Sequence, residues 1–247
     1  TASLTPLEMA ETYAVFANGG FKVKHHLIDR IESANGTILY QTRAVSVCRE
    51  NCEKRLVSID AAFDNRLQPT QSELFDLELA ERMAPRVLNP RIHFLIDDML
   101  RDVIQVGTAK KASKLGRKDI AGKTGTTNDQ VDAWFSGYHP TLVASVWVGF
   151  DQPKTLGRSE YGGRAALPIW IEFMRTALKN IPERNPTLPA GLIATRIDPD
   201  TGAKALNSES TSIREFFLIE NPPKEPAPNA LVPADSGSGI SSPQQLF

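Results

Sequence analysis

Three strand-like segments follow one another with short connections in the middle of the chain. They cover residues 119–127, 132–138 and 141–150, and His139-Pro140 forms the turn between the last two. Strands joined by such short connections pair antiparallel, because a parallel pair needs a long crossover. The segment 142–150 is nearly all apolar and predicts a central strand buried on both faces. An antiparallel sheet is therefore the main constraint on the fold.

Amphipathic helices are predicted on both sides of these strands in the sequence. Thr5 is typical of an N-cap, with Pro6 at the first helical position and Glu8 three residues after the cap. Apolar residues repeat at helical spacing over 90–107 and again over 167–178. The predicted fold class is α/β in its α+β form, an antiparallel sheet flanked by helices.

Composition and charge exclude several classes of protein. The formal net charge is −1, and 41% of the residues are hydrophobic, the balance of a globular protein with a real core. A nucleic-acid-coating protein needs a dense basic field, which is missing here. No apolar run reaches the roughly 18 residues of a membrane span. Because the chain opens at Thr1 without a Met, we expect a piece of a longer polypeptide.

The patterns divide the chain into five parts. Residues 1–42 and 93–182 are predicted to belong to one domain, with a hairpin in 21–41. The predicted parts between and after them are an inserted excursion or small hairpin over 43–92, a C-terminal extension over 183–221, and a disordered Pro-, Ser- and Gly-rich tail over 222–247.

The segment 120–129, Ile-Ala-Gly-Lys-Thr-Gly-Thr-Thr-Asn-Asp, is the one that indicates chemistry. In a strand, Thr124 and Thr126 point to the same side. Gly125 between them lets another backbone approach the strand edge, and Lys123 adds a positive charge. These features would bind an extended peptide that ends in a carboxylate, and their donors could stabilise an oxyanion.

A bare Lys-Thr-Gly tripeptide occurs by chance in many proteins. Its context favours function here, because the segment lies in a strand that follows a helix and a basic connector and precedes two further strands and a helix. That order suits an antiparallel sheet with helices on its faces.

The chain resembles class A penicillin-binding proteins, most closely those of the 1a type. The matching blocks occur in the family's order and spacing: Thr5–Gly20, Gly107-Thr108-Ala109, Ile120–Asp129, Asp132–Tyr138, Trp147–Asp151, Gly162-Gly163 and Ala166–Trp170. The resemblance covers roughly residues 1–40 and 90–180, which makes 1–42 and 93–182 parts of a transpeptidase domain, the second with the Lys-Thr-Gly strand. It implies the penicillin-binding, serine β-lactamase-like transpeptidase fold, of which this chain carries the C-terminal portion.

The resemblance also implies an activity and roles for individual residues. The family cross-links peptidoglycan stem peptides through a serine acyl-enzyme, and β-lactams acylate the same serine. Lys123 would set the electrostatics near a second motif's Ser, and the hydroxyls of Thr124 and Thr126 would bind the substrate carboxylate. The N–H of Thr126 would form half of the oxyanion hole. Gly125 and Thr127 complete the expected substrate-binding segment, and no cofactor or metal is implied.

The nucleophile of the family has no counterpart in this sequence. Its motif is S-x-x-K, but Ser33, Ser58, Ser72 and Ser113 have Gly36, Ala61, Phe75 and Gly116 at that offset. We therefore expect the S-x-x-K and S-x-N motifs, a glycosyltransferase domain and the membrane anchor to lie in a missing N-terminal portion. The expected location is the periplasmic face of the bacterial inner membrane. The chain alone is expected to be inactive, and its expected partners are that portion, stem peptides and β-lactams, with no nucleic acid.

Other candidate residues have plainer interpretations. Zinc at Cys48 and Cys52 would need two more ligands, and the family's oxidising periplasm favours a disulfide between these two cysteines. The pair Asp97-Asp98 is predicted to be a solvated surface feature, and the loop 198–202 a turn more than a calcium site. The basic residues of 110–118 would solvate the approach to the site or attract an anionic substrate.

Two other functions stay open. A β-lactamase would share the Lys-Thr-Gly strand, but those hydrolases are compact and lack the long tail and the inserted region. A non-catalytic interaction module would bind partners through residues 43–92 or 183–221 and would not be acylated.

Overall fold

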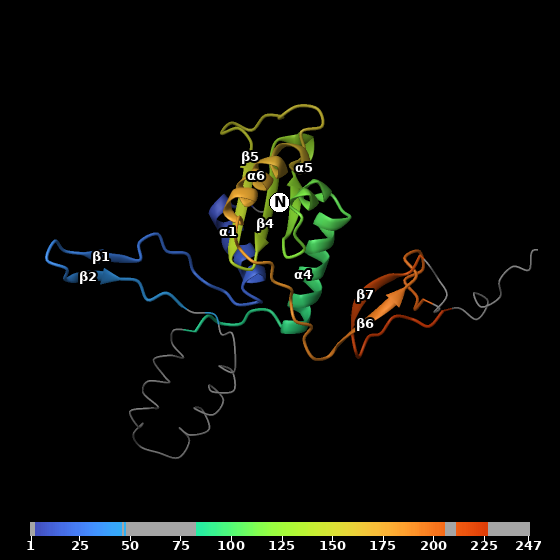
Figure 1. Cartoon of the computed structure of the whole chain (residues 1–247). Helices are drawn as coiled ribbons and strands as arrows, with labels where there is room; N and C mark the ends of the chain where they lie inside the picture. Colours follow the sequence, from blue (N-terminus) through green and yellow to red (C-terminus); the bar gives the residue numbers. More distant parts are fainter. Residues whose placement is uncertain (1–2, 46, 48–82, 206–210, 227–247) are drawn as a thin grey trace, which may run out of the picture. The chain divides into compact units, whose positions relative to one another are not determined.

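The computed structural model describes residues 3–45, 47, 83–205 and 211–226 (Figure 1). The chain divides into two compact units, Thr1–Pro189 and Ala190–Phe247. Cys48, Cys52, most of the predicted excursion 43–92 and most of the predicted tail 222–247 lie outside the described residues. None of the described helices combines the length and hydrophobicity that crossing a membrane would require.

A three-stranded antiparallel sheet forms the centre of the first unit. It contains β3 (Ala121–Thr126), β4 (Ala133–His139) and β5 (Leu142–Val148), in the order β3-β4-β5. Lys123 pairs with Ser136 across β3 and β4, and Ser136 pairs with Ser145 across β4 and β5. The antiparallel sheet predicted for this part of the sequence is confirmed.

Among the strands that the structure describes, the centre of the sheet is β4, so the prediction that the apolar segment 142–150 is the central strand is wrong for these residues. β4 lies between its two neighbours and is buried along most of its length, whereas β5 is half-buried and Trp147 is 37% exposed. Helices α1 (Pro6–Ala17) and α6 (Leu167–Ala177) both pack against β5. The apolar run therefore indicates that helices cover the faces of the strand. It does not indicate how many strands pair with its edges.

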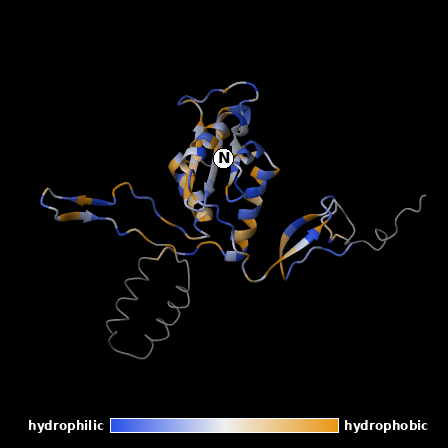
Figure 2. Cartoon of the chain, viewed as in Figure 1, coloured by the Kyte–Doolittle hydropathy of each residue, from blue (hydrophilic) through white to orange (hydrophobic). Residues whose placement is uncertain are grey.

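The main core lies between the sheet, α6, α4 (Pro90–Gln105) and the 3₁₀ helix η1 (Lys110–Leu115). Phe135 of β4 meets Trp170 of α6 edge to face, with ring centroids 4.9 Å apart. Ile104 of α4 and Ala112 of η1 are fully buried in the same cluster. Hydrophobic and hydrophilic bands alternate along α4 in Figure 2, as expected for the amphipathic helix predicted over 90–107.

Helix α1 packs against β4 and β5 with its own aromatic residues. Its start is fixed by a capping box, in which the Glu8 backbone N–H donates to Thr5 Oγ1 at 3.2 Å and the Thr5 N–H donates to Glu8 Oε2 at 2.7 Å. Tyr13 and Phe16 then contact the ring of Tyr138 on β4, with centroids 6.3 and 6.4 Å apart. The predicted N-cap is confirmed, and the aromatic residues further along α1 make its contact with the sheet.

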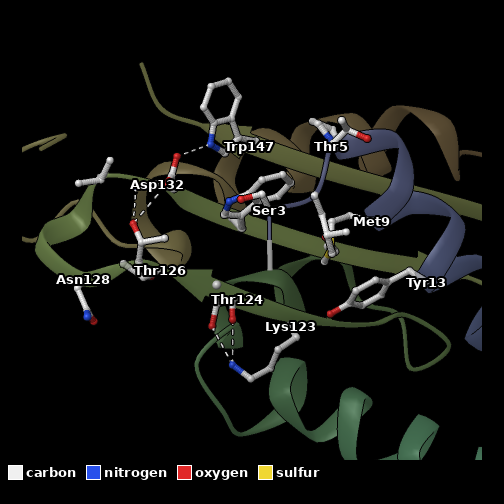
Figure 3. Close-up of a pocket in the computed structure, with 17 residues that line it drawn as sticks. Ser3, Thr5, Met9, Tyr13, Lys123, Thr124, Thr126, Asn128, Asp132 and Trp147 are labelled. Atoms are coloured by element: carbon white, nitrogen blue, oxygen red, sulfur yellow. Dashed lines mark hydrogen bonds between the residues drawn. The ribbon is translucent and has the colours of Figure 1, made fainter. Parts of the chain in front are cut away.

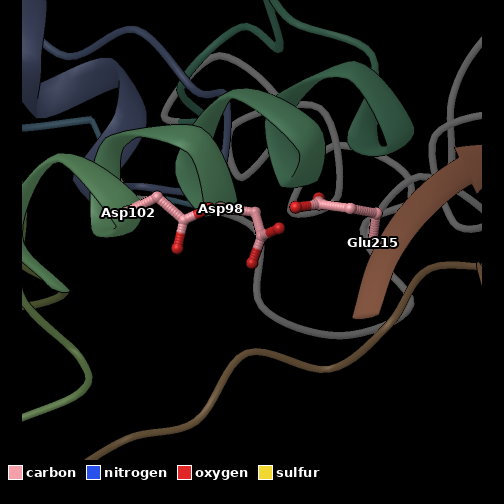
Figure 4. Close-up of side chains that lie close together, drawn as sticks. All are labelled: Asp98, Asp102 and Glu215. Atoms are coloured by element: carbon pink, nitrogen blue, oxygen red, sulfur yellow. The ribbon is translucent and has the colours of Figure 1, made fainter. Parts of the chain in front are cut away.

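The prediction that Asp97-Asp98 is solvated is wrong for Asp97. This residue is 5% exposed; it accepts a hydrogen bond from the Tyr138 hydroxyl at 2.7 Å and pairs with Arg101 at 2.8 Å. The buried Tyr138 hydroxyl on β4 needs a hydrogen-bond acceptor, and Asp97 supplies it. The sequence of the helix alone does not reveal this partner. Asp98 lies one turn before Asp102 on α4 (Figure 4), and burial raises the pKa of Asp102. Glu215, also labelled in Figure 4, belongs to strand β7 (Ile213–Leu218) of the second unit.

Two small hairpins complete the described part of the chain. In the first unit, β1 (Arg30–Glu32) pairs antiparallel with β2 (Ile38–Gln41) within the predicted hairpin, and every residue of both strands is exposed. In the second unit, β6 (Leu192–Ile197) pairs antiparallel with β7 (Ile213–Leu218). After β6, Asp198 Oδ1 accepts hydrogen bonds from the backbone N–H groups of Asp200 and Thr201, which is the predicted turn.

A buried charged cluster ties the start of β3 to the end of β4. Arg117 donates from Nε and Nη2 to the two carboxylate oxygens of Asp119 at 2.8 and 2.7 Å, and its Nη1 donates to the Ile181 carbonyl. His139 is fully buried, with Nε2 3.0 Å from Asp119 Oδ2. Arg117 is therefore a structural residue, and the prediction that it solvates the approach to the site is wrong.

The pKa values of this cluster make the fold sensitive to acid. Burial alone would raise the pKa of Asp119, but hydrogen bonds from Arg117 and from the Arg184 N–H outweigh it and lower this pKa. Burial lowers the pKa of His139, against a smaller raising effect of Asp119. Both groups bind a proton more readily in the unfolded chain, so their stabilisation is present at high pH and is lost as the pH falls.

We expect the free energy of unfolding to fall below about pH 6.5, where unfolded histidine takes up a proton, and to fall further below about pH 4. D119N leaves Arg117 and His139 without their anion and should lower the free energy of unfolding by about 3 kcal/mol. The free energy of unfolding of this variant should also depend less on pH. Urea unfolding between pH 4 and 8 measures both effects. Asp151 is exposed, so D151N is the matched control; equal unfolding midpoints for the two variants would contradict this role of Asp119.

Candidate active site

A groove of about 980 Å³ lies between the start of α1 and strand β3 (Figure 3). All five predicted substrate-binding residues line it: Lys123, Thr124, Gly125, Thr126 and Thr127. From α1 come Met9 and Tyr13, and the sheet contributes Trp134 and Trp147. In the described part of the chain, β3 pairs with β4 alone, so alternate backbone N–H groups of β3 point away from the sheet.

Lys123 is exposed at the groove and folds along its own strand. Its Nζ donates to the Thr124 carbonyl at 3.0 Å and lies 3.4 Å from Thr124 Oγ1. The ammonium therefore lies beside a hydroxyl and an exposed strand edge. Such a combination suits the binding of an anion or of a developing negative charge.

The two hydroxyls predicted to bind a carboxylate, those of Thr124 and Thr126, each have a hydrogen-bond partner outside the sheet. Thr124 Oγ1 is 3.0 Å from the Oγ1 of Thr108, which follows α4. Thr126 Oγ1 accepts a hydrogen bond at 3.0 Å from the N–H of Gly162, the first residue of the short helix α5 (Gly162–Ala165). Thr124 and Thr126 are two residues apart in a strand and so share one side, as predicted.

Gly162 lies so close to the sheet that no other residue fits. A Cβ atom there would lie 2.2 Å from the Trp134 carbonyl oxygen and 2.5 Å from the Gly125 carbonyl oxygen. The adjacent Gly163 has more room, since its Cβ would lie 3.1 Å from the Thr108 carbonyl oxygen. Contact between α5 and the two strands therefore depends on Gly162 specifically.

Asp132 closes the connection between β3 and β4, which contains the 3₁₀ turn η2 (Asn128–Gln130). The Asp132 N–H donates to Thr127 Oγ1 at 2.8 Å, and Trp147 Nε1 donates to Asp132 Oδ1 at 2.8 Å. Thr127 is thus engaged in holding the loop. Sequence reasoning assigned no role to Asp132 or Trp147, although both belong to the matching blocks, because a loop contact to a strand 15 residues later leaves no local pattern.

Sequence reasoning also assigned no role to Thr108 or Gly162. Both stand in short blocks, Gly107-Thr108-Ala109 and Gly162-Gly163, whose spacing matched the family. That spacing was the only signal available, since neither block has helical or strand periodicity of its own. The fold brings Thr108 to Thr124 and Gly162 to Thr126, both on strand β3.

The comparisons with known proteins agree with this geometry. A family model described as the penicillin-binding protein transpeptidase domain matches residues 2–175. The chain belongs to this transpeptidase family. The predicted family and fold class are confirmed.

Relatives in the family match nearly the whole chain. Penicillin-binding protein 1A of Pseudomonas aeruginosa is 42% identical over 98% of this chain and 30% of its own length. Penicillin-binding protein 1A of Neisseria gonorrhoeae is 34% identical over 99% of this chain and 26% of its own length. The crystal structure of penicillin-binding protein 1A from Haemophilus influenzae matches 91% of this chain and 33% of that protein, with a TM-score of 0.73 and 34% identity. The chain therefore spans about a third or less of these relatives.

The contact at Gly162 gives a test of how the transpeptidase strand is supported. G162A should lower the free energy of unfolding by about 1 to 3 kcal/mol, because the added methyl group overpacks a backbone contact. G163A, one position along, is the comparison and should cost less, because its Cβ would lie 3.1 Å and not 2.2 Å from the nearest backbone oxygen. Urea unfolding of both variants decides the matter, and equal midpoints would contradict a special role for Gly162.

Proposed function

We propose that this chain supplies the substrate-binding wall of a serine-type D-Ala–D-Ala transpeptidase that cross-links peptidoglycan stem peptides. The observation that carries the proposal is that Lys123–Thr127 line one groove at an edge of the described sheet. The ammonium of Lys123 and the hydroxyls of Thr124 and Thr126 suit a peptide that ends in a carboxylate.

The proposed reaction has two steps. A serine Oγ attacks the carbonyl carbon between the two D-Ala residues, the C–N bond breaks, and D-Ala leaves with the serine proton on its amine. The amine of a second stem peptide then attacks the ester, forming the cross-link and returning a proton to the serine. In both steps the N–H of Thr126 would stabilise the oxyanion together with the N–H of the nucleophile.

The nucleophile is proposed to come from the N-terminal portion of the same protein, on an S-x-x-K motif that the 247 residues do not contain. The family's S-x-N motif is proposed to lie in the same portion. Support comes from the groove itself, which has an apolar lining of Met9, Tyr13, Trp134 and Trp147 beside Lys123. An apolar wall next to a cation suits a packed protein segment that brings a serine to the ammonium. We further propose that this portion carries a peptidoglycan glycosyltransferase and a periplasmic membrane anchor.

Intact mass spectrometry of the full-length protein, before and after excess benzylpenicillin, tests the function. A stable adduct of one penicillin on the protein is expected, since β-lactams would acylate the transpeptidase serine. Rapid turnover of penicillin without an adduct would instead indicate a β-lactamase. Neither adduct nor turnover would indicate a non-catalytic interaction module.

The role of the strand residues is tested by substitution in the full-length protein. K123A should slow acylation by benzylpenicillin about a hundredfold, because it removes the cation beside the reacting groups. T126V should slow it about tenfold through the loss of one hydrogen bond to a charged group. Stopped-flow or quenched-flow acylation rates measure both effects.

The matched control for these variants is K179A. Lys179 is exposed just after α6, away from the residues that line the groove. This variant should be acylated at the rate of the unsubstituted protein. Unchanged rates for K123A and T126V as well would remove both residues from the mechanism.

A further inference from the structure

Thr108 places its hydroxyl next to that of Thr124, on the strand that lines the groove. It follows α4 and belongs to a turn held by backbone hydrogen bonds, from Gly107 N–H to the Asp102 carbonyl and from Ala109 N–H to the Val103 carbonyl, both at 2.9 Å. Ala109 is fully buried in the main core. The Thr108 hydroxyl is therefore carried by a fixed backbone, 3.0 Å from the hydroxyl of Thr124.

The numbers of protons and lone pairs on the two hydroxyls decide which of Thr108 and Thr124 donates. A threonine hydroxyl has one proton to donate and two lone pairs to accept. Lys123 Nζ, 3.4 Å away, can only donate to Thr124 Oγ1. If Thr124 gave its proton to Thr108, it would have none for a ligand, and an ionised carboxylate only accepts hydrogen bonds. Thr124 can therefore donate to a carboxylate and keep its hydrogen bond with Thr108 only when Thr108 is the donor of that bond.

We propose that Thr108 is a positioning residue, whose hydroxyl donates to Thr124 and so leaves the Thr124 proton directed at the carboxylate of a bound stem peptide or β-lactam. This proposal rests on the proposed transpeptidase function. Thr108 need not touch the ligand, since it acts through the occupied lone pair of Thr124.

The neighbouring Thr126 has the same arrangement with an unambiguous donor. The N–H of Gly162 donates to Thr126 Oγ1 at 3.0 Å and cannot accept. The Thr126 proton is thereby left for another acceptor. The hydroxyls of Thr124 and Thr126 thus each have a neighbouring donor, one from the turn after α4 and one from α5. In both cases the donor occupies a lone pair and leaves the threonine proton for the ligand.

The test compares four variants of the full-length protein: T108V, T108S, T124V and the double variant T108V/T124V. The measurement is the second-order rate constant for acylation by benzylpenicillin. T108V should slow acylation about tenfold, the effect of losing a hydrogen bond that supports a charged ligand. T108S keeps the hydroxyl and should restore the rate. T176V is the control, because Thr176 is an exposed threonine on α6 outside the groove.

The double variant separates positioning from general structural support. If Thr108 acts through Thr124, T108V should cause no further loss once T124V is present, whereas structural damage would add to the effect of T124V. Additive losses, a T108V rate equal to the unsubstituted rate, or a T108S rate as low as that of T108V would each overturn the proposal. Failure of the unsubstituted protein to be acylated would instead overturn the proposed function.

Discussion

The close packing of α5 against the first two strands of the sheet is the contact on which the candidate site depends. At Gly162 the backbone of α5 comes near enough to the carbonyl oxygens of Gly125 and Trp134 to exclude any side chain. The same glycine uses its N–H to hold the Thr126 hydroxyl. One glycine therefore packs directly against β3 and β4 and also holds the hydroxyl of Thr126, one of the residues that line the groove.

The opposite end of the sheet is held by charge. Arg117, Asp119 and His139 join the start of β3, the end of β4 and the segment after α6 in a cluster from which water is largely excluded. Asp97 does similar work between α4 and β4 through the hydroxyl of Tyr138. Buried ionic groups of this kind are costly unless every partner is present. These buried ionic groups therefore fix the relative positions of elements that are distant in the sequence.

Much of this arrangement could be predicted from local patterns. The capping box at Thr5, the helices over 90–107 and 167–178, and the three strands all have periodicities or end signals that a single element can carry. The errors share a cause. The position of β5 in the sheet, the burial of Asp97 and the structural role of Arg117 depend on what lies against them, and an apolar or charged residue looks the same in a sequence whether its neighbour is solvent, a helix or a strand.

The amino-acid sequence by itself determined the family and singled out the residues of the strand that lines the groove, because a motif and its spacing are properties of the chain. Only the tertiary structure decided which groups support that strand. Thr108 lies 16 residues before Thr124, and Gly162 lies 36 residues after Thr126. Hydrogen-bond partners so far apart leave no periodic trace, since their meeting depends on how the helices pack on the sheet.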